Sequence, residues 1–159
     1  MNQERLSKWL KIIILGVGIC GAIIYFYIFP FWGREIIAEK PEFTNAYIPW
    51  LIFLWITAVP CYVVLICGLR IASEIEKDNS FSEINARRLK IVSYLAAGDC
   101  LLFFSGNIIF LFLDMNYAET VLLSLIIVFF GVAVSVTSAA LSHLVYKAAK
   151  LQEESKFTI

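Results

Sequence analysis

Asp99 carries the ionisable group with the least expected position in this sequence. It lies inside a long apolar stretch, and no Lys or Arg occurs near its level in any other apolar stretch. A charge at mid-membrane costs about 3 kcal/mol on insertion scales, and desolvation disfavours the ionised form, so we expect a largely protonated carboxyl. Such a group can donate a hydrogen bond between helices, carry protons in a wet cavity or recognise a ligand.

Other unusual residues fall at about the same depth in the remaining apolar stretches. Pro60 lacks a backbone donor and frees the carbonyl of Ile56, and Asn107 adds a second polar group further along the stretch that holds Asp99. We expect Asp99 to bond either a nearby serine or the freed carbonyl. The last apolar stretch carries a stripe of small residues on one helix face: Gly131, Ser135, Ser138 and Ser142.

Two roles for Asp99 therefore stay open, one structural and one functional. The structural role is favoured, because a single acid without a basic partner or relay is a weak signal for proton transfer. The lone His143 is expected near the inner interface in a packing role. The cysteines at 20, 61, 67 and 100 form no CxxC pair and are read as small packing residues. Without paired carboxylates, an activated nucleophile or a metal set, we expect no enzyme and no cofactor.

The elements that position these groups follow from composition. Of 159 residues, 60% are hydrophobic and 16% charged, which excludes a soluble enzyme, a disordered chain and a disulfide scaffold. The net charge is zero, so the sequence shows no footprint for direct nucleic-acid binding. About 20 apolar residues are needed to cross a bilayer as a helix. Four stretches qualify: about 10–29, 48–69, 89–113 and 121–145.

Lys and Arg in the connections predict the orientation of these spans. Eleven of them fall in the N-terminal segment, the second connection and the tail, and two fall in the first connection. Because basic residues are retained on the cytoplasmic side, both termini are expected inside the cell. The sequence thus predicts a single all-α domain, an integral membrane four-helix bundle with up-down-up-down topology. The plasma membrane is the expected location.

The predicted cytoplasmic loop, residues 70–88, has helical ends. The second helix is expected to continue to about Lys77 and to break at Asp78 and Asn79. Ser80 and Glu83 have the spacing of a capping box, which predicts that a new helix starts at Ser80 and enters the third span. The basic residues that follow would lie at the headgroups, where they anchor the chain or bind an acidic partner or anionic lipid: Arg87, Arg88 and Lys90.

The tail, residues 146–159, is expected to continue the fourth helix. Its candidate contacts combine acidic and apolar side chains: Glu153, Glu154, Phe157 and Ile159. On the other side of the membrane, residues 31–46 are expected to form a modest outer loop. A very short turn at 114–119 makes the third and fourth helices an antiparallel hairpin.

Two segments carry a resemblance to a known family. They are 70–90, with Asn79-Ser80-Phe81-Ser82, and 148–159, with Leu151-Gln152-Glu153-Glu154 and the final Thr158-Ile159. With four spans in this length, the chain resembles the bacterial membrane proteins named domain of unknown function 2975. Members often end in a Glu-Asn-Asp-Leu-Thr-Ile type tail, and here Ser155 and Lys156 replace the Asn and Asp. The genes of that family often lie beside one for a small Cro-type helix-turn-helix regulator, so the resemblance implies a membrane partner of such a regulator.

The leading interpretation is a non-enzymatic membrane sensor or regulatory partner, which contacts a small cytoplasmic protein through its loop and tail. That protein would be a helix-turn-helix DNA-binding regulator if the resemblance holds. The first alternative is a small oligomeric channel or transporter component that uses Asp99, with a homo-oligomer as its working form. The second is a structural or immunity-type partner of another membrane protein.

Overall fold

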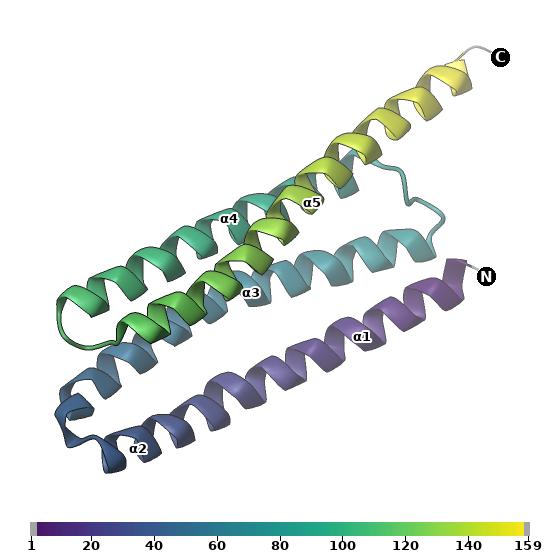
Figure 1. The fold of residues 1–159 in the computed structure, drawn as a ribbon. Coiled ribbons are helices and arrows are strands. Elements are labelled where there is room, and N and C mark those ends of the chain that lie inside the picture. Colours follow the sequence, from purple (N-terminus) through teal and green to yellow (C-terminus); the bar gives the residue numbers. More distant parts are fainter. Residues whose placement is uncertain (1–2, 158–159) are drawn as a thin grey trace.

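The computed structural model describes residues 3–157, and within that range every regular element is helical (Figure 1). The first membrane-length helical segment joins α1 (Gln3–Ile23), η1 (Ile24–Ile28) and α2 (Phe29–Glu39). A short 3₁₀ segment, η2 (Pro41–Ala46), leads into α3 (Tyr47–Glu76). Then follow α4 (Glu83–Phe112) and α5 (Ala118–Phe157). The predicted all-α, four-span fold is confirmed, since four helical segments are long and apolar enough to cross a membrane.

The expected outer loop at 31–46 is wrong in its form, because α2 stays helical to Glu39. The reason lies at Pro30. The preceding η1 is a π-helix, in which the amide of Phe29 donates to the carbonyl of Ile24. If this i to i−5 pattern continued, the carbonyl of Tyr25 would accept from the backbone amide of residue 30. Pro30 has no amide hydrogen, so this bond cannot form. The indole Nε1 of Trp55 donates to this carbonyl instead, at 3.2 Å, so the helix crosses the proline without breaking.

The turn between α3 and α4 breaks where the sequence predicted, but α4 begins later than predicted. Asp78 has a positive φ of 58° just after the end of α3. The N-cap of α4 is Ser82, whose side chain accepts from the amide of Asn85 at 3.3 Å, so the Ser80–Glu83 capping box is wrong. Asn85 is 1% exposed and donates to the carbonyls of Asn79 and Ser80, both at 3.2 Å. These bonds hold residues 79–82 as a compact turn instead of a first helical turn.

The four long helices lie in a curved row in the order α1, α3, α4, α5. Chain direction alternates along this row, so both described ends of the chain lie at one end of the bundle, here called the terminal end (Figure 1). Within residues 3–157, no Cα atom of α1 comes within 8 Å of α4 or α5, and none of α3 does so with α5. The bundle is therefore open between α1 and α5.

Burial in this fold is inverted relative to a soluble protein. The buried side chains are small or polar, such as Ala72, Ser135 and Asn107, whereas Leu101, Phe112 and Phe129 are each more than 70% exposed. Helices that associate in lipid use small residues for close approach and hydroxyls for cross-helix bonds, because lipid already solvates large apolar groups. The inversion is what a bilayer environment requires.

Candidate functional site

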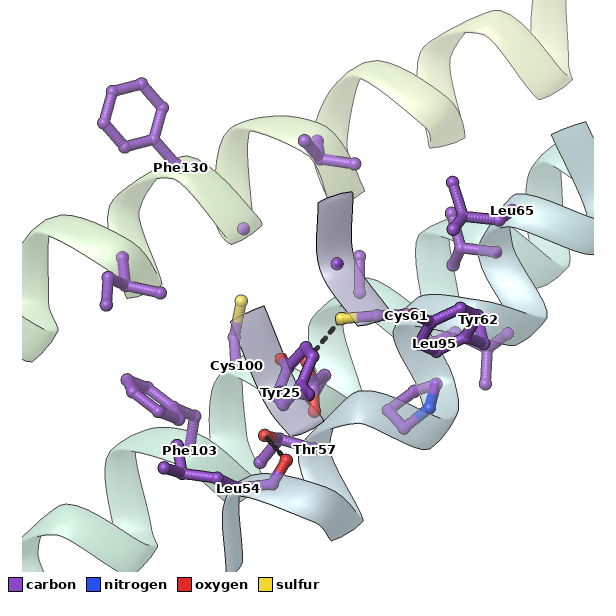
Figure 2. A pocket seen from close by; sticks show the side chains of 18 of the residues that line it. Tyr25, Leu54, Thr57, Cys61, Tyr62, Leu65, Leu95, Cys100, Phe103 and Phe130 are labelled. Carbon is purple, nitrogen blue, oxygen red and sulfur yellow. Dashed lines mark hydrogen bonds between the residues drawn. The ribbon is translucent and has the colours of Figure 1, made fainter. Parts of the chain in front are cut away.

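A cavity of about 470 Å³ lies at the centre of the row and is bordered by all four long helical segments (Figure 2). Its wall is almost entirely apolar. The Tyr25 ring of η1 points into the space bordered by Thr57 and Cys61 of α3 and Cys100 of α4. Two sequence features position these groups. The π-turn carries Tyr25, and Pro60 lies in the same wall of α3.

Asp99 borders this cavity and is only half paired. Its Oδ2 accepts a hydrogen bond from the Cys61 thiol across α3 and α4, with an Sγ to Oδ2 distance of 3.6 Å. Its Oδ1 is buried and has no hydrogen-bond partner. Neither expected partner, the serine stripe or the carbonyl freed by Pro60, bonds to it within the described residues. A thiol is a weak donor, so the carboxyl keeps most of its capacity to bind.

Serines of α5 instead form hydrogen bonds with the N-terminal half of α4. Ser135 Oγ donates to the carbonyl of Ser93 at 2.9 Å, and the two hydroxyls lie 3.3 Å apart. Because the Ser135 proton is already committed, Ser93 Oγ is the donor in the second bond. Ser142 Oγ donates to the carbonyl of Ala86 at 2.7 Å. Ser138, between them, is 8% exposed. The stripe is therefore a seam between α4 and α5.

The other intramembrane candidates lie away from the cavity. Asn107 is 1% exposed; its Oδ1 accepts from the side chain of Asn116 at 3.3 Å, which ties α4 to the turn that precedes α5. His143 is exposed on α5. Among the described residues, no group of three or more His, Cys, Asp or Glu side chains could hold a metal ion.

At the terminal end, Arg88 is engaged within the chain. Its Nη1 donates to the carbonyl of Arg70 at 3.1 Å and to Asn85 Oδ1 at 3.2 Å, and it lies 4.0 Å from Glu74 Oε1. The side-chain Nδ2 of Asn79 donates to Glu74 Oε2 at 3.0 Å, and this bond, together with Lys77 and Arg88, lowers the pKa of the Glu74 carboxyl. Arg88 thus joins α4 to the end of α3 across the turn, which sequence reasoning missed because Arg70 and Glu74 lie on the preceding helix.

The remaining predicted contacts lie on the outside of the terminal end. Arg87 is exposed, with Glu83 at 4.0 Å, and Lys90 is exposed beside the ring of Tyr94. Glu153 and Glu154 are exposed on the last turns of α5. For Phe157 only the backbone is described, as the final residue of α5, and Ile159 lies outside the described residues.

Comparison of the sequence with known proteins places the chain in a family. The chain is 27% identical over 162 residues to the uncharacterized membrane protein YoaS of Bacillus subtilis (strain 168), covering 99% of this chain and 100% of that protein. No solved structure matches the chain. Residues 32–159 match the family described as "Protein of unknown function (DUF2975)". The match includes the turn at 77–82, Asp99 and the seam serines, and the chain is thus a multi-pass membrane protein that belongs to the DUF2975 family.

Proposed function

We propose that this protein is a non-enzymatic membrane sensor or regulatory partner that holds a small cytoplasmic protein at its terminal end. The observation that carries the proposal is the length of α5. At 40 residues it extends about 60 Å, twice the roughly 30 Å of the hydrocarbon core. Its last turns stand clear of the other helices (Figure 1).

The surface around this projecting helix suits a protein partner. Leu151 is 66% exposed there, in a segment that also carries Glu153 and Glu154. Arg87 and Lys90 are exposed on α4, so the terminal end also offers basic groups to a partner. By the family resemblance, the partner is a small helix-turn-helix regulator, and DNA contact belongs to that partner.

The proposal requires the terminal end to face the cytoplasm, as the distribution of Lys and Arg predicts. In a background without the four native cysteines, a cysteine at Thr44 should react with an impermeant maleimide added to intact cells. A cysteine at Gln152 should react only after the cells are permeabilised. Labelling of Gln152→Cys in intact cells would reverse the orientation and remove the basis of the proposal.

The docking itself is tested with a photo-crosslinking amino acid at Gln152, with the same amino acid at Thr44 as the matched control. We expect a crosslink from position 152 to a small soluble protein, identified by mass spectrometry as a helix-turn-helix regulator, and none from position 44. A chain that ends at Lys150 should lose the partner on co-purification from native membranes. If position 152 captures only membrane proteins, the structural or immunity-type alternative is favoured.

One observation favours the alternative of an oligomeric channel or transporter component, namely the central cavity with Asp99 on its wall. It predicts proton flux in proteoliposomes that contain the purified protein, and loss of that flux in Asp99→Asn. Asp99→Asn protein that is folded and still supports flux would exclude a proton-carrying role for this carboxyl.

A further inference from the structure

We propose that the central cavity is a binding site for an amphiphilic monocation, a protonated amine with an apolar body, and that Asp99 is its counter-ion. This inference is independent of any cytoplasmic partner. It rests on the shape of the cavity, on the chemistry of its wall and on the incomplete pairing of one carboxyl.

The size and lining of the cavity fit a small organic molecule. A volume of about 470 Å³ lies within the usual range for ligand sites, roughly 300–1,000 Å³. Such sites are mostly apolar with a few convergent polar groups that fix orientation. Here the polar groups gather on one side, at Tyr25, Thr57 and Cys61, while the α5 wall consists of side chains such as Val128 and Val134.

Asp99 determines the charge of the occupant. Besides Asp99, the ionisable groups in the described lining are Tyr25, Cys61, Tyr62 and Cys100, and α5 contributes only apolar residues and Gly131. None of these can act as a cation, and Oδ1 has no donor. Within the described lining, the carboxyl therefore lacks a counter-charge, and its Oδ1 lacks a hydrogen bond. A protonated amine supplies both at once, which a neutral apolar molecule or a lipid chain does not.

The open side of the bundle gives such a molecule a route. Within the described residues, no Cα atoms of α1 and α5 come within 8 Å of each other, although both helices border the cavity, and we infer that a ligand enters between them. An amphiphilic amine partitions into the bilayer. From there its charged head moves out of the lipid and into the cavity, where it pairs with Asp99. The Cys61 thiol, as a weak donor, is displaced from Oδ2 at little cost.

The test uses the full chain in nanodiscs of zwitterionic lipid, with dansylcadaverine as the probe. This compound joins a primary amine to an environment-sensitive fluorophore, and its N-acetyl derivative keeps the body without the charge. We expect saturable fluorescence enhancement with the amine and none with the acetylated form, beyond that of empty nanodiscs. Equal binding of the two compounds would overturn the proposal.

Two pairs of variants locate the site. Asp99→Asn should weaken binding of the amine at least about tenfold, whereas Ser105→Ala, an exposed change on the same helix, should not. Val134→Trp fills the α5 wall of the cavity and should also abolish binding, while Val136→Trp, on an exposed face of α5, should not. Circular dichroism and gel filtration establish that each variant is folded. If Asp99→Asn fails to fold, the Val134 and Val136 pair decides, and undiminished binding in Val134→Trp would refute the proposed site.

Discussion

The two antiparallel pairs of this molecule, α4 with α5 and α1 with α3, are held together in different ways. The α4–α5 seam is closed by serine bonds to the facing helix, and a Cβ placed on Gly131 would overlap Cys100 Sγ. The α1–α3 seam has contacts that are spread out along the helices, from Ser7 at the terminal end through Tyr62 to Trp55. The Trp55 contact reaches Tyr25 in the π-turn that follows α1, and this turn borders the cavity.

The difference shows how one small bundle can combine a rigid half with an adaptable half. Small residues and committed hydroxyls leave the α4–α5 pair little freedom to separate. In the α1–α3 pair, a large side chain fills the gap, since the hydroxyl of Tyr62 reaches the carbonyl of Gly18 at 2.9 Å. A long side chain on a wider seam can follow a change in helix spacing. The cavity lies where these two kinds of packing meet.

Overfilling the rigid seam should give the largest effect. Ser135→Leu removes the donor to Ser93 and inserts a larger side chain, which we expect to lower the free energy of unfolding by about 3 kcal/mol. SDS titration in mixed micelles measures this change. Ser105→Leu, at an exposed position of α4, is the matched control and should unfold like wild type. Equal stability of the two variants would mean that the stripe faces lipid.

The same substitution in both seams sharpens the comparison. Gly131→Ala would place a methyl group against Cys100 Sγ, so the thiol or the helices must shift, and it should cost about 1–2 kcal/mol. Gly21→Ala should be nearly neutral, because its Cβ would meet Tyr62 Oη at 3.4 Å, an ordinary contact distance. Thermal melting in detergent compares the two directly. A larger loss for Gly21→Ala than for Gly131→Ala would reverse our assignment of the rigid half.

Removing one bond from the adaptable seam should have a smaller effect. Tyr62→Phe loses the hydroxyl that donates to Gly18 but keeps the ring that fills the gap. Interhelical hydrogen bonds of this kind contribute about 0.6 kcal/mol on average in membrane proteins. We expect a slight decrease in stability by SDS titration. A loss as large as that of Ser135→Leu would show that the α1–α3 seam is not adaptable.

The smallest expected effect concerns pH at the terminal end of the α1–α3 seam. The Lys11 ammonium donates to the Glu76 carboxylate and lowers the pKa of that group. Because the pKa of Glu76 is lower in the folded than in the unfolded chain, its ionisation stabilises the folded state at pH values above the unfolded-state pKa. This stabilisation is lost as the pH falls through the folded-state pKa. Wild type should therefore melt slightly above Glu76→Gln at about pH 7 and match it at about pH 3. A difference that grows on acidification would contradict the sign.

Periodicity made the rigid half predictable from the sequence. The spacing of Ser135, Ser138 and Ser142 places them on one face whatever the neighbouring helix is. The four membrane-length helices, the break at Asp78 and the helical tail were likewise accessible, because apolar length and breaking residues act locally. The capping box failed because Asn85 ties down the carbonyls of Asn79 and Ser80, a bond pattern that spacing alone does not reveal.

The adaptable half was not predictable to the same degree. Asp99 could be identified as unusual, but its partner Cys61 was read as a packing residue, since a thiol at that position gives no signal without knowledge of the facing helix. The π-turn depends on Pro30 and Trp55 together, which lie in different spans. The open side of the row depends on how α1 docks, and that is a property of packing across the whole molecule.

The extension of α5 beyond its partner helix has a mechanical consequence. Ser142 of α5 bonds to the carbonyl of Ala86 on α4, and residues 143–157 rise roughly 22 Å beyond that point at about 1.5 Å per residue. A continuous helix of this length transmits tilt as a rod does. Rotating the α4–α5 hairpin by about 10° in the bilayer carries the tip of the rod about 4 Å sideways. Small rotations of the hairpin within the membrane therefore displace the end of the α5 helix by about the distance of a side-chain contact.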